Sequence, residues 1–338
     1  MFNKPTVIVI GAGASFEYGF PLGATLKDQV AKAARFRFEY GHHLTMGSEE
    51  LLNHIRRHVS GDISRQNIYT RAGSMLAQAI PSFISIDEAL HFVSSSREAV
   101  EIGKIAIIEN ILNAERNSNL RFDLRTGRPS LPDDGWLSEL FSMAVAGLRR
   151  ENLADAFKNI TFINFNYDRA IEQYLYFALQ ERTSADAELA ETIVGELNML
   201  RPYGSIGSFS PIMNHPESFG TTAHFDPFQR LSNLATYTEK KPLHDAAAMR
   251  NALQGAHLVL YLGFGYHASN LGVVANSEAS KATSVLGTVK GINSLNHAMI
   301  TGNIIANIKT MRNKVELLDM TAAEMLKDLR PRILMTVS

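Results

Sequence analysis

Thr6-Val7-Ile8-Val9-Ile10-Gly11-Ala12-Gly13-Ala14-Ser15 is the stretch from which the fold of this 338-residue chain can be inferred. Its first half is a run of β-branched residues, typical of a parallel strand buried on both faces. Its second half is small, and glycines let a backbone approach a phosphate at the start of a helix, where N–H donors are unpaired. The stretch therefore predicts a buried strand that feeds a phosphate-cradling turn. A tight turn without ligand is the alternative, because Phe16 stands where GxGxxG has its third glycine.

Three more runs combine a strand with a small or polar loop and helical spacing after it, at 160–165, 257–262 and 283–286. Residues 314–318 fit either an edge strand or a helix start. The alternation predicts an α/β fold, a Rossmann-like and mostly parallel sheet with helices on both faces. We expect one domain over 1–338, with a helical insertion at 31–155 and the rest of the sheet in 156–330. The strand-end loops should then meet at one crevice, because ligands of such sheets bind outside the carboxyl ends of the strands.

Composition excludes several classes of function. The formal net charge is -1, so no overall field would hold a polyanion or an anionic membrane, and we expect neither nucleic-acid nor membrane binding. The chain has no cysteine, which rules out disulfides and thiolate zinc sites, and we expect no metal site. No apolar run approaches the about 20 residues that span a bilayer. These features favour a cytoplasmic protein.

Polar residues follow the second predicted strand at Asn166-Tyr167-Asp168. At a strand's carboxyl end an amide can hold a ribose hydroxyl or water, and a carboxylate can accept from a carboxamide. The alternative is an Asx turn that caps the next helix. Weaker cofactor-binding candidates follow the third and fourth strands, where glycines would admit the adenosine half of a dinucleotide: Gly263, Gly265, His267, Asn270, Gly287 and Thr288.

The run from Gly11 to Pro21 resembles the opening G-A-G-I-S-x-E-x-G-I-P of the sirtuin family almost position by position. The resemblance implies an NAD-binding loop made of Gly11, Ala12, Gly13, Ala14, Ser15, Glu17 and Pro21. The chain departs from sirtuin deacylases directly afterwards, with Leu22-Gly23-Ala24 in place of D-F-R. It also lacks the four zinc-binding cysteines of their small domain, so protein deacylation is disfavoured.

Asn166-Tyr167-Asp168 resembles the N-Y-D of sirtuin-like bacterial NAD hydrolases, in which the Asn is catalytic and the Asp lies beside the nicotinamide. Segments 85–90 and 103–107 also resemble sirtuin-like proteins of phage defence. The resemblance implies an NAD hydrolase that releases nicotinamide and ADP-ribose in a bacterial anti-phage system. A homo-oligomer and a partner ATPase or helicase are part of the same expectation.

One position departs from these relatives. They read H-G-S or H-P-Y-G, with a catalytic His, where this chain has Arg201-Pro202-Tyr203-Gly204-Ser205. Arg201 or Tyr203, depending on the alignment, would occupy the place of that His, which favours weakened or partner-dependent cleavage. Two other functions stay open, a non-catalytic NAD or ADP-ribose sensor and an NAD(P)-dependent oxidoreductase. The missing third glycine counts against the oxidoreductase.

Overall fold

The structure is a computed structural model that describes residues 1–40, 42–223, 225–235, 246–276 and 278–338. The chain divides into two compact units, which are treated separately. The sheet unit comprises Met1–Gly19, Asn119–Pro202 and Lys240–Ser338, and the helical unit comprises Phe20–Ser118 and Tyr203–Glu239. The segment expected as a helical insertion, 31–155, is therefore shared: its first part belongs to the helical unit, and 119–155 belongs to the sheet unit.

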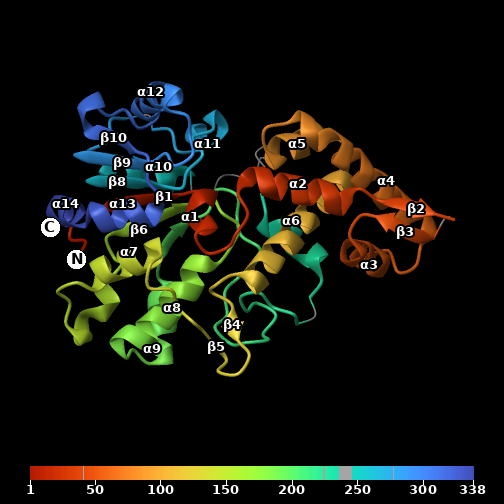
Figure 1. The fold of residues 1–338 in the computed structure, drawn as a ribbon, viewed down its shortest axis with the longest axis horizontal. Helices are drawn as coiled ribbons and strands as arrows, with labels where there is room; N and C mark the ends of the chain where they lie inside the picture. Colours follow the sequence, from red (N-terminus) through yellow and green to blue (C-terminus); the bar gives the residue numbers. More distant parts are fainter. Residues whose placement is uncertain (41, 224, 236–245, 277) are drawn as a thin grey trace. The chain divides into compact units, whose positions relative to one another are not determined.

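The sheet unit is built on six parallel strands in the order β10-β9-β8-β1-β6-β7 (Figure 1). Numbered by their appearance along the chain, these strands run 3-2-1-4-5-6 from β7 to β10, and the order reverses between β1 and β8. The predicted α/β class and Rossmann-like parallel sheet are confirmed. The strands are β1 (Thr6–Ile10), β6 (Ile160–Asn164), β7 (Asn198–Leu200), β8 (Leu258–Leu262), β9 (Ser284–Thr288) and β10 (Val315–Leu318).

Burial explains why these segments are strands. Every residue of β1 and β8 is at most 1% exposed, and Thr6 pairs in parallel register with both Ile160 and Leu258. Of residues 314–318, which fitted either a strand or a helix start, Val315–Leu318 form the edge strand β10, paired with β9, and Lys314 ends a short 3-10 helix. The three-residue strand β7 was missed, because Asn198–Leu200 is too short to carry a pattern.

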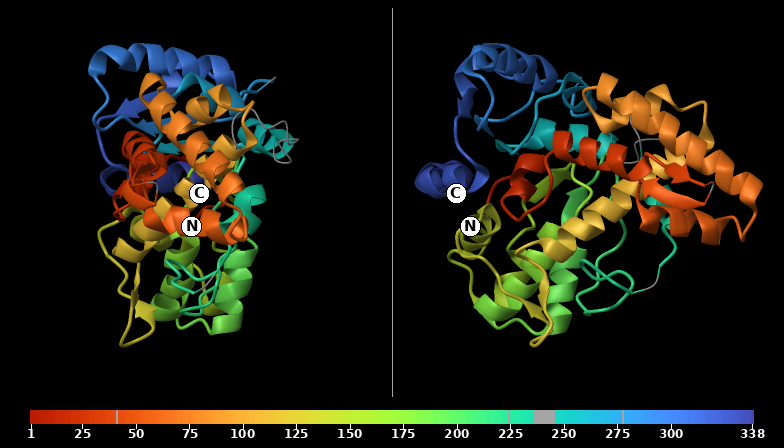
Figure 2. Two further views of the ribbon diagram at one scale, coloured as in Figure 1. Left: turned by 90° about the vertical axis from the view of Figure 1, so that its right-hand side faces the viewer. Right: turned by 45° about the vertical axis from the view of Figure 1, so that its right-hand side comes forward.

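Helices surround the sheet (Figure 1), and the two ends of the chain lie together (Figure 2), where the N–H of Asn3 donates to the carbonyl of Val337 at 2.9 Å. The sheet unit also contains α1 (Ala12–Phe16), β4 (Phe122–Asp123), β5 (Arg128–Pro129), α7 (Trp136–Val145), η2 (Arg150–Asp155), α8 (Ala170–Thr183), α9 (Ala187–Gly195), α10 (Ala246–Gly255), α11 (Ala268–Val273), η4 (Ser294–Asn296), α12 (His297–Ile308), η5 (Arg312–Lys314), α13 (Ala322–Asp328) and α14 (Arg330–Val337).

The helical unit packs around one long buried helix, α6 (Arg97–Asn117). Four of its helices begin at a residue whose side chain accepts a hydrogen bond from the first turn: Ser48, Asp62, Ser85 and Ser96 are the N-caps of α3 (Glu49–His58), α4 (Ile63–Ala79), α5 (Ile86–Phe92) and α6. The other elements of this unit are α2 (Gly23–Ala34), β2 (Arg37–Glu39), β3 (His43–Met46), η1 (Ile80–Ser82) and η3 (Pro227–Asn233).

Helix α6 carries a buried acid, Glu109, which is 8% exposed. Its Oε1 lies 3.3 Å from Nε2 of His54 on α3. Burial, together with the negative charge of Glu50, raises the pKa of Glu109 from 4.5 to about 8. A folded-state pKa above the unfolded one means that the folded state keeps its proton longer. The contribution of Glu109 to stability is therefore complete below pH 4.5 and is lost as the pH rises through about 8.

We expect Glu109→Gln to reduce the fall in melting temperature between about pH 6 and about pH 9, because Gln cannot ionise. A change of about 1 kcal/mol moves the melting temperature of such a domain by about 2–4 °C, so the difference is measurable by circular dichroism. Glu98→Gln, on the same helix, is the control and should follow the parent protein. If the melting temperatures of Glu109→Gln and the parent fall equally as the pH rises, Glu109 does not hold its proton in the folded state.

Candidate functional site

The glycine turn after β1 packs against the turn that follows β8, at the point where the strand order reverses. The N–H of Gly11 donates to the carbonyl of Leu262 at 3.0 Å, and the N–H of Gly13 donates to the carbonyl of Gly263 at 2.9 Å. A Cβ on Gly13 would lie 2.8 Å from the Cα of Gly263. Gly13 is therefore required by contact between two backbones. Because this backbone contact already explains the glycine, Gly13 is not in itself evidence for a bound pyrophosphate.

Asn166 lies at the carboxyl end of β6 and is 8% exposed. Its Nδ2 donates to the carbonyl of Gly11 at 3.0 Å and to Oγ of Ser15 at 2.8 Å. A carbonyl only accepts, so the contact with Gly11 fixes which side of the amide carries hydrogens. Both hydrogens of the amide are used by the protein. Its Oδ1 receives no hydrogen bond from any described residue, and a ligand at this site would find an acceptor.

Two neighbouring side chains, those of Asp168 and Asn164, accept hydrogen bonds from the backbone at this turn. Oδ1 of Asp168, a residue 3% exposed, accepts from the N–H of Ala170 at the start of α8 at 3.1 Å. The Asx turn that was the alternative for Asp168 is thus present in the structure, one residue before Arg169, the N-cap of α8. Sequence reasoning missed Asn164, the last residue of β6, whose Oδ1 accepts from the N–H of Asn166 at 3.0 Å. Its only signal was a polar residue at the end of an apolar strand.

Arg201, just after β7, binds the same turn from the other side. Its Nη1 donates to the carbonyls of Asn166 and Asp168 at 2.9 and 3.0 Å. Its Nη2 donates to Oε1 of Glu172, in the first turn of α8, at 2.7 Å. The two side chains of this ion pair are 12% and 17% exposed. Glu172 was also missed from the sequence, where nothing distinguishes it from an ordinary helical glutamate.

Several residues predicted for the adenine side make contacts that hold the loop after β8 in position. The N–H of Gly263 donates to Oγ1 of Thr288 at 2.8 Å. Tyr266, buried and with φ +54°, donates its hydroxyl to the carbonyl of Thr288 at 3.1 Å. That hydroxyl also fills the place where a Cβ on Gly287 would lie. Gly287 and Thr288 therefore hold this loop in position.

Glu17 contacts protein backbone on two helices. Its carboxylate accepts from the N–H of Trp136 in α7 at 3.2 Å and from the N–H of Ala323 in α13 at 3.0 Å. Burial raises the pKa of Glu17, and these two backbone bonds act in the opposite direction. The carbonyl of Ala14 accepts from the indole of the same Trp136 at 3.0 Å. Glu17 thus serves as a cap for two helices.

The other predicted residues differ in exposure and in the unit to which they belong. Gly265 and His267 are exposed, and Ala12 and Asn270 are half-buried. Pro21 and Tyr203 belong to the helical unit, where the carbonyl of Tyr203 accepts from the N–H of Ala235 at 3.1 Å. The sheet unit therefore brings together two groups, one around Asn166 at β1, β6 and β7 and one around Gly263 at β1, β8 and β9.

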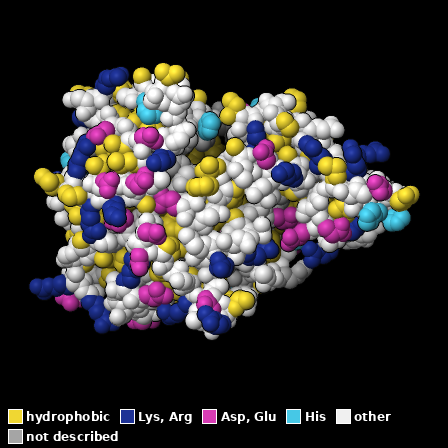
Figure 3. All heavy atoms as spheres, viewed as in Figure 1, with side chains coloured by type: hydrophobic (Ala, Val, Ile, Leu, Met, Phe, Trp, Pro, Cys, Tyr) yellow, Lys and Arg dark blue, Asp and Glu magenta, His cyan; other side chains and the backbone are white. Residues whose placement is uncertain are grey.

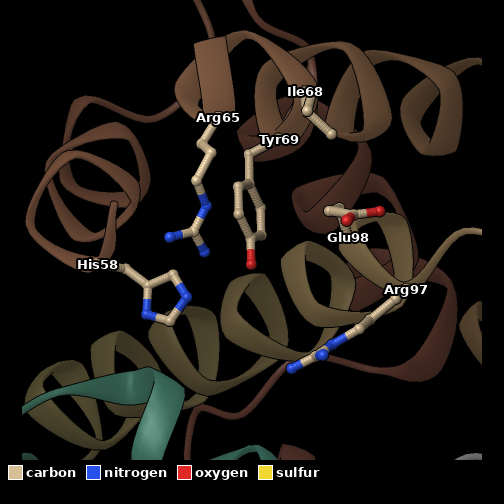
Figure 4. Close-up of a pocket in the computed structure, with 6 residues that line it drawn as sticks. All are labelled: His58, Arg65, Ile68, Tyr69, Arg97 and Glu98. Carbon is tan, nitrogen blue, oxygen red and sulfur yellow. The ribbon is translucent and has the colours of Figure 1, made fainter. Parts of the chain in front are cut away.

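The helical unit contains a pocket, lined by residues that were not predicted as site residues (Figure 4). Arg65 and Tyr69 from α4, Arg97 from α6 and His58 from α3 point toward one space. Arg97 pairs with Glu101 at 2.6 Å, and the hydroxyl of Tyr69 donates to the same carboxylate at 2.7 Å. With Glu98 also in the lining, the charges of this pocket balance and favour no class of ligand.

On the face drawn in Figure 3, basic and acidic side chains are interspersed. Within the described ranges, no group of three or more His, Asp or Glu side chains is placed to hold a metal ion. None of the described helices is both long and apolar enough to cross a membrane. The sequence matches no protein-family model, and comparison with curated proteins finds no relative.

Proposed function

We propose that the sheet unit binds NAD at the carboxyl edge of its sheet and cleaves the bond between nicotinamide and ribose. The observation that carries the proposal is the geometry of Asn166: its Nδ2 is bonded to Gly11 and Ser15, and its Oδ1 is left as an acceptor. The site lies at the carboxyl ends of β1 and β6, beside the reversal of strand order, where ligands of doubly wound sheets bind.

Cleavage of this bond requires few catalytic groups, because nicotinamide is a good leaving group. Nicotinamide leaves as a neutral molecule, positive charge develops on the ribose carbon, and water adds there with loss of one proton, giving ADP-ribose. An acceptor that binds a ribose hydroxyl or the attacking water can orient either group and stabilise the developing charge. Asn166 Oδ1 has this character, and a carboxamide of the leaving group could donate to Asp168.

The resemblance to sirtuin-like defence proteins supports a wider proposal, NAD depletion during phage infection in the bacterial cytoplasm. Homo-oligomerisation and control by a partner ATPase or helicase belong to that wider proposal. An enzyme that destroys a shared cofactor must be restrained until it is needed.

A non-catalytic NAD or ADP-ribose sensor is the second candidate, and Arg201 is the observation that favours it. A guanidinium stays protonated at neutral pH and cannot act as a general base. Loss of a general base typically costs about 10²–10⁴ in rate. Departure of nicotinamide requires no proton abstraction, however, so slow cleavage remains compatible with Arg201.

The products formed from NAD distinguish the candidates. Purified protein is incubated with NAD, the products are separated, and the melting temperature is measured with and without NAD. At about 100 times its Kd, NAD would add about 2.7 kcal/mol of stability. Nicotinamide and ADP-ribose support the hydrolase, intact NAD with a raised melting temperature supports the sensor, and NADH formed with an oxidisable substrate supports the oxidoreductase. Intact NAD with no thermal shift contradicts all three.

A further inference from the structure

We propose that Arg201 is a positioning residue, which with Glu172 holds the turn Asn166-Tyr167-Asp168 in the shape that presents Asn166 to a ligand. The inference rests on the proposed function for its catalytic consequence only. The contacts themselves join three segments that follow or flank β6 and β7: Arg201, the carbonyls of Asn166 and Asp168, and the first turn of α8.

The geometry of these contacts matches a guanidinium. One nitrogen, Nη1, reaches two carbonyl oxygens at 2.9 and 3.0 Å while Nη2 reaches Glu172 at 2.7 Å. A planar fork directs donors from two separate nitrogens toward these three oxygens, whereas the three donors of Lys share one nitrogen and His has at most two donors, on opposed ring nitrogens. Arg201 is therefore suited to this turn in a way that a histidine at the same position is not.

The ion pair with Glu172 also reduces the electrostatic effect of Arg201 on a ligand at this site. The ion pair with Glu172 is largely buried, with side chains 12% and 17% exposed. A carboxylate at this distance offsets the positive charge, so Arg201 opposes charge development on the ribose less than a lone cation would. Three of the five N–H donors of Arg201 bond to protein atoms, which leaves it less available to bind pyrophosphate than an unpaired arginine.

The test uses the full chain and a measurement that does not depend on NAD. The amide hydrogens of Asn166 and Ala170 are both bonded to side chains of this turn and its strand, at 3.0 and 3.1 Å. In Arg201→Met we expect hydrogen exchange at these two amides to be faster by about tenfold or more, since bonds to a charged group are lost. Glu172→Gln, which keeps an acceptor for Nη2, should change exchange less.

Arg182→Met is the matched control, because Arg182 also binds an acid, Asp133 at 2.7 Å, from the other end of α8. It should leave exchange at Asn166 and Ala170 as in the parent. Unchanged exchange at these amides in Arg201→Met, or an equal increase in Arg182→Met, would overturn the assignment.

Turnover then separates positioning from general destabilisation. At saturating NAD, Arg201→Ala should lower kcat by about tenfold or more with little change in KM, and added guanidinium should restore part of the rate. Loss of rate without rescue, at parental exchange, would contradict a positioning role. If the parent releases no nicotinamide, the proposed function fails, and the exchange measurement still decides whether Arg201 holds the turn.

Discussion

Gly263→Ala is expected to destabilise the sheet unit by about 3 kcal/mol or more, a large fraction of the about 5–15 kcal/mol that stabilises an ordinary folded protein. Gly263 has φ +57°, and a Cβ built there would collide with the backbone N of Ala14 and lie 2.6 Å from the Cα of Gly13. Both neighbours are backbone atoms of the turn after β1, in which the N–H of Gly13 donates to the carbonyl of Gly263. They cannot move aside without breaking the turn, and the left-handed conformation adds its own cost for alanine.

Urea denaturation followed by circular dichroism measures this loss. Gly272→Ala is the control, since Gly272 lies in α11 and a Cβ there meets no heavy atom within 4 Å. An alanine inside a helix is favoured over glycine by up to about 1 kcal/mol, so this variant should match or exceed the parent. A parental midpoint for Gly263→Ala would mean that the two turns are not packed as described.

Asn166→Ala is expected to lower nicotinamide release by about 10²–10³, the cost of removing one polar group that acts on developing charge. The same change leaves the carbonyl of Gly11 and the hydroxyl of Ser15 without their donor, which costs about 1–3 kcal/mol of stability. Rates must therefore be compared at a temperature where both proteins are folded.

Ser15→Ala is the matched variant for Asn166. It removes one acceptor of Nδ2 but keeps the bond to Gly11 and the Oδ1 atom. We expect it to lower the rate by less than about tenfold, in line with one neutral hydrogen bond. If Asn166→Ala and Ser15→Ala reduce nicotinamide release equally, Oδ1 has no special part in the reaction.

The strands were predictable because burial on both faces leaves a local signature, a run of β-branched residues. The runs at 6–10, 160–165 and 257–262 correspond closely to β1, β6 and β8. The run at 283–286 overlaps the first three residues of β9. The strand order was not predictable, because pairing depends on contacts between distant segments. A helical segment at 31–155 was predicted, but the joining of Phe20–Ser118 with Tyr203–Glu239 in one unit was not, because it also depends on contacts between distant segments.

At the site, too, local sequence pattern predicted where residues lie but not which distant residues they contact. Asn166 and Asp168 were placed at a strand's carboxyl end by local pattern, and the structure has them there. The roles of Glu17 and Thr288 depend on partners far along the chain, such as Ala323, which is 306 residues from Glu17. No local pattern signals such a contact. The cofactor role of Glu17 and Thr288 therefore stays a prediction, and their backbone contacts are known only from the structure.

We propose that this chain cleaves NAD by means of Asn166, and nicotinamide release tests this proposal most directly. The parent and Asn166→Ala are incubated with saturating NAD, and nicotinamide and ADP-ribose are quantified over time. We predict equal amounts of the two products from the parent and a release rate lower by about 10²–10³ from Asn166→Ala. Equal rates from the two folded proteins, or intact NAD after prolonged incubation with the parent, would contradict the claim.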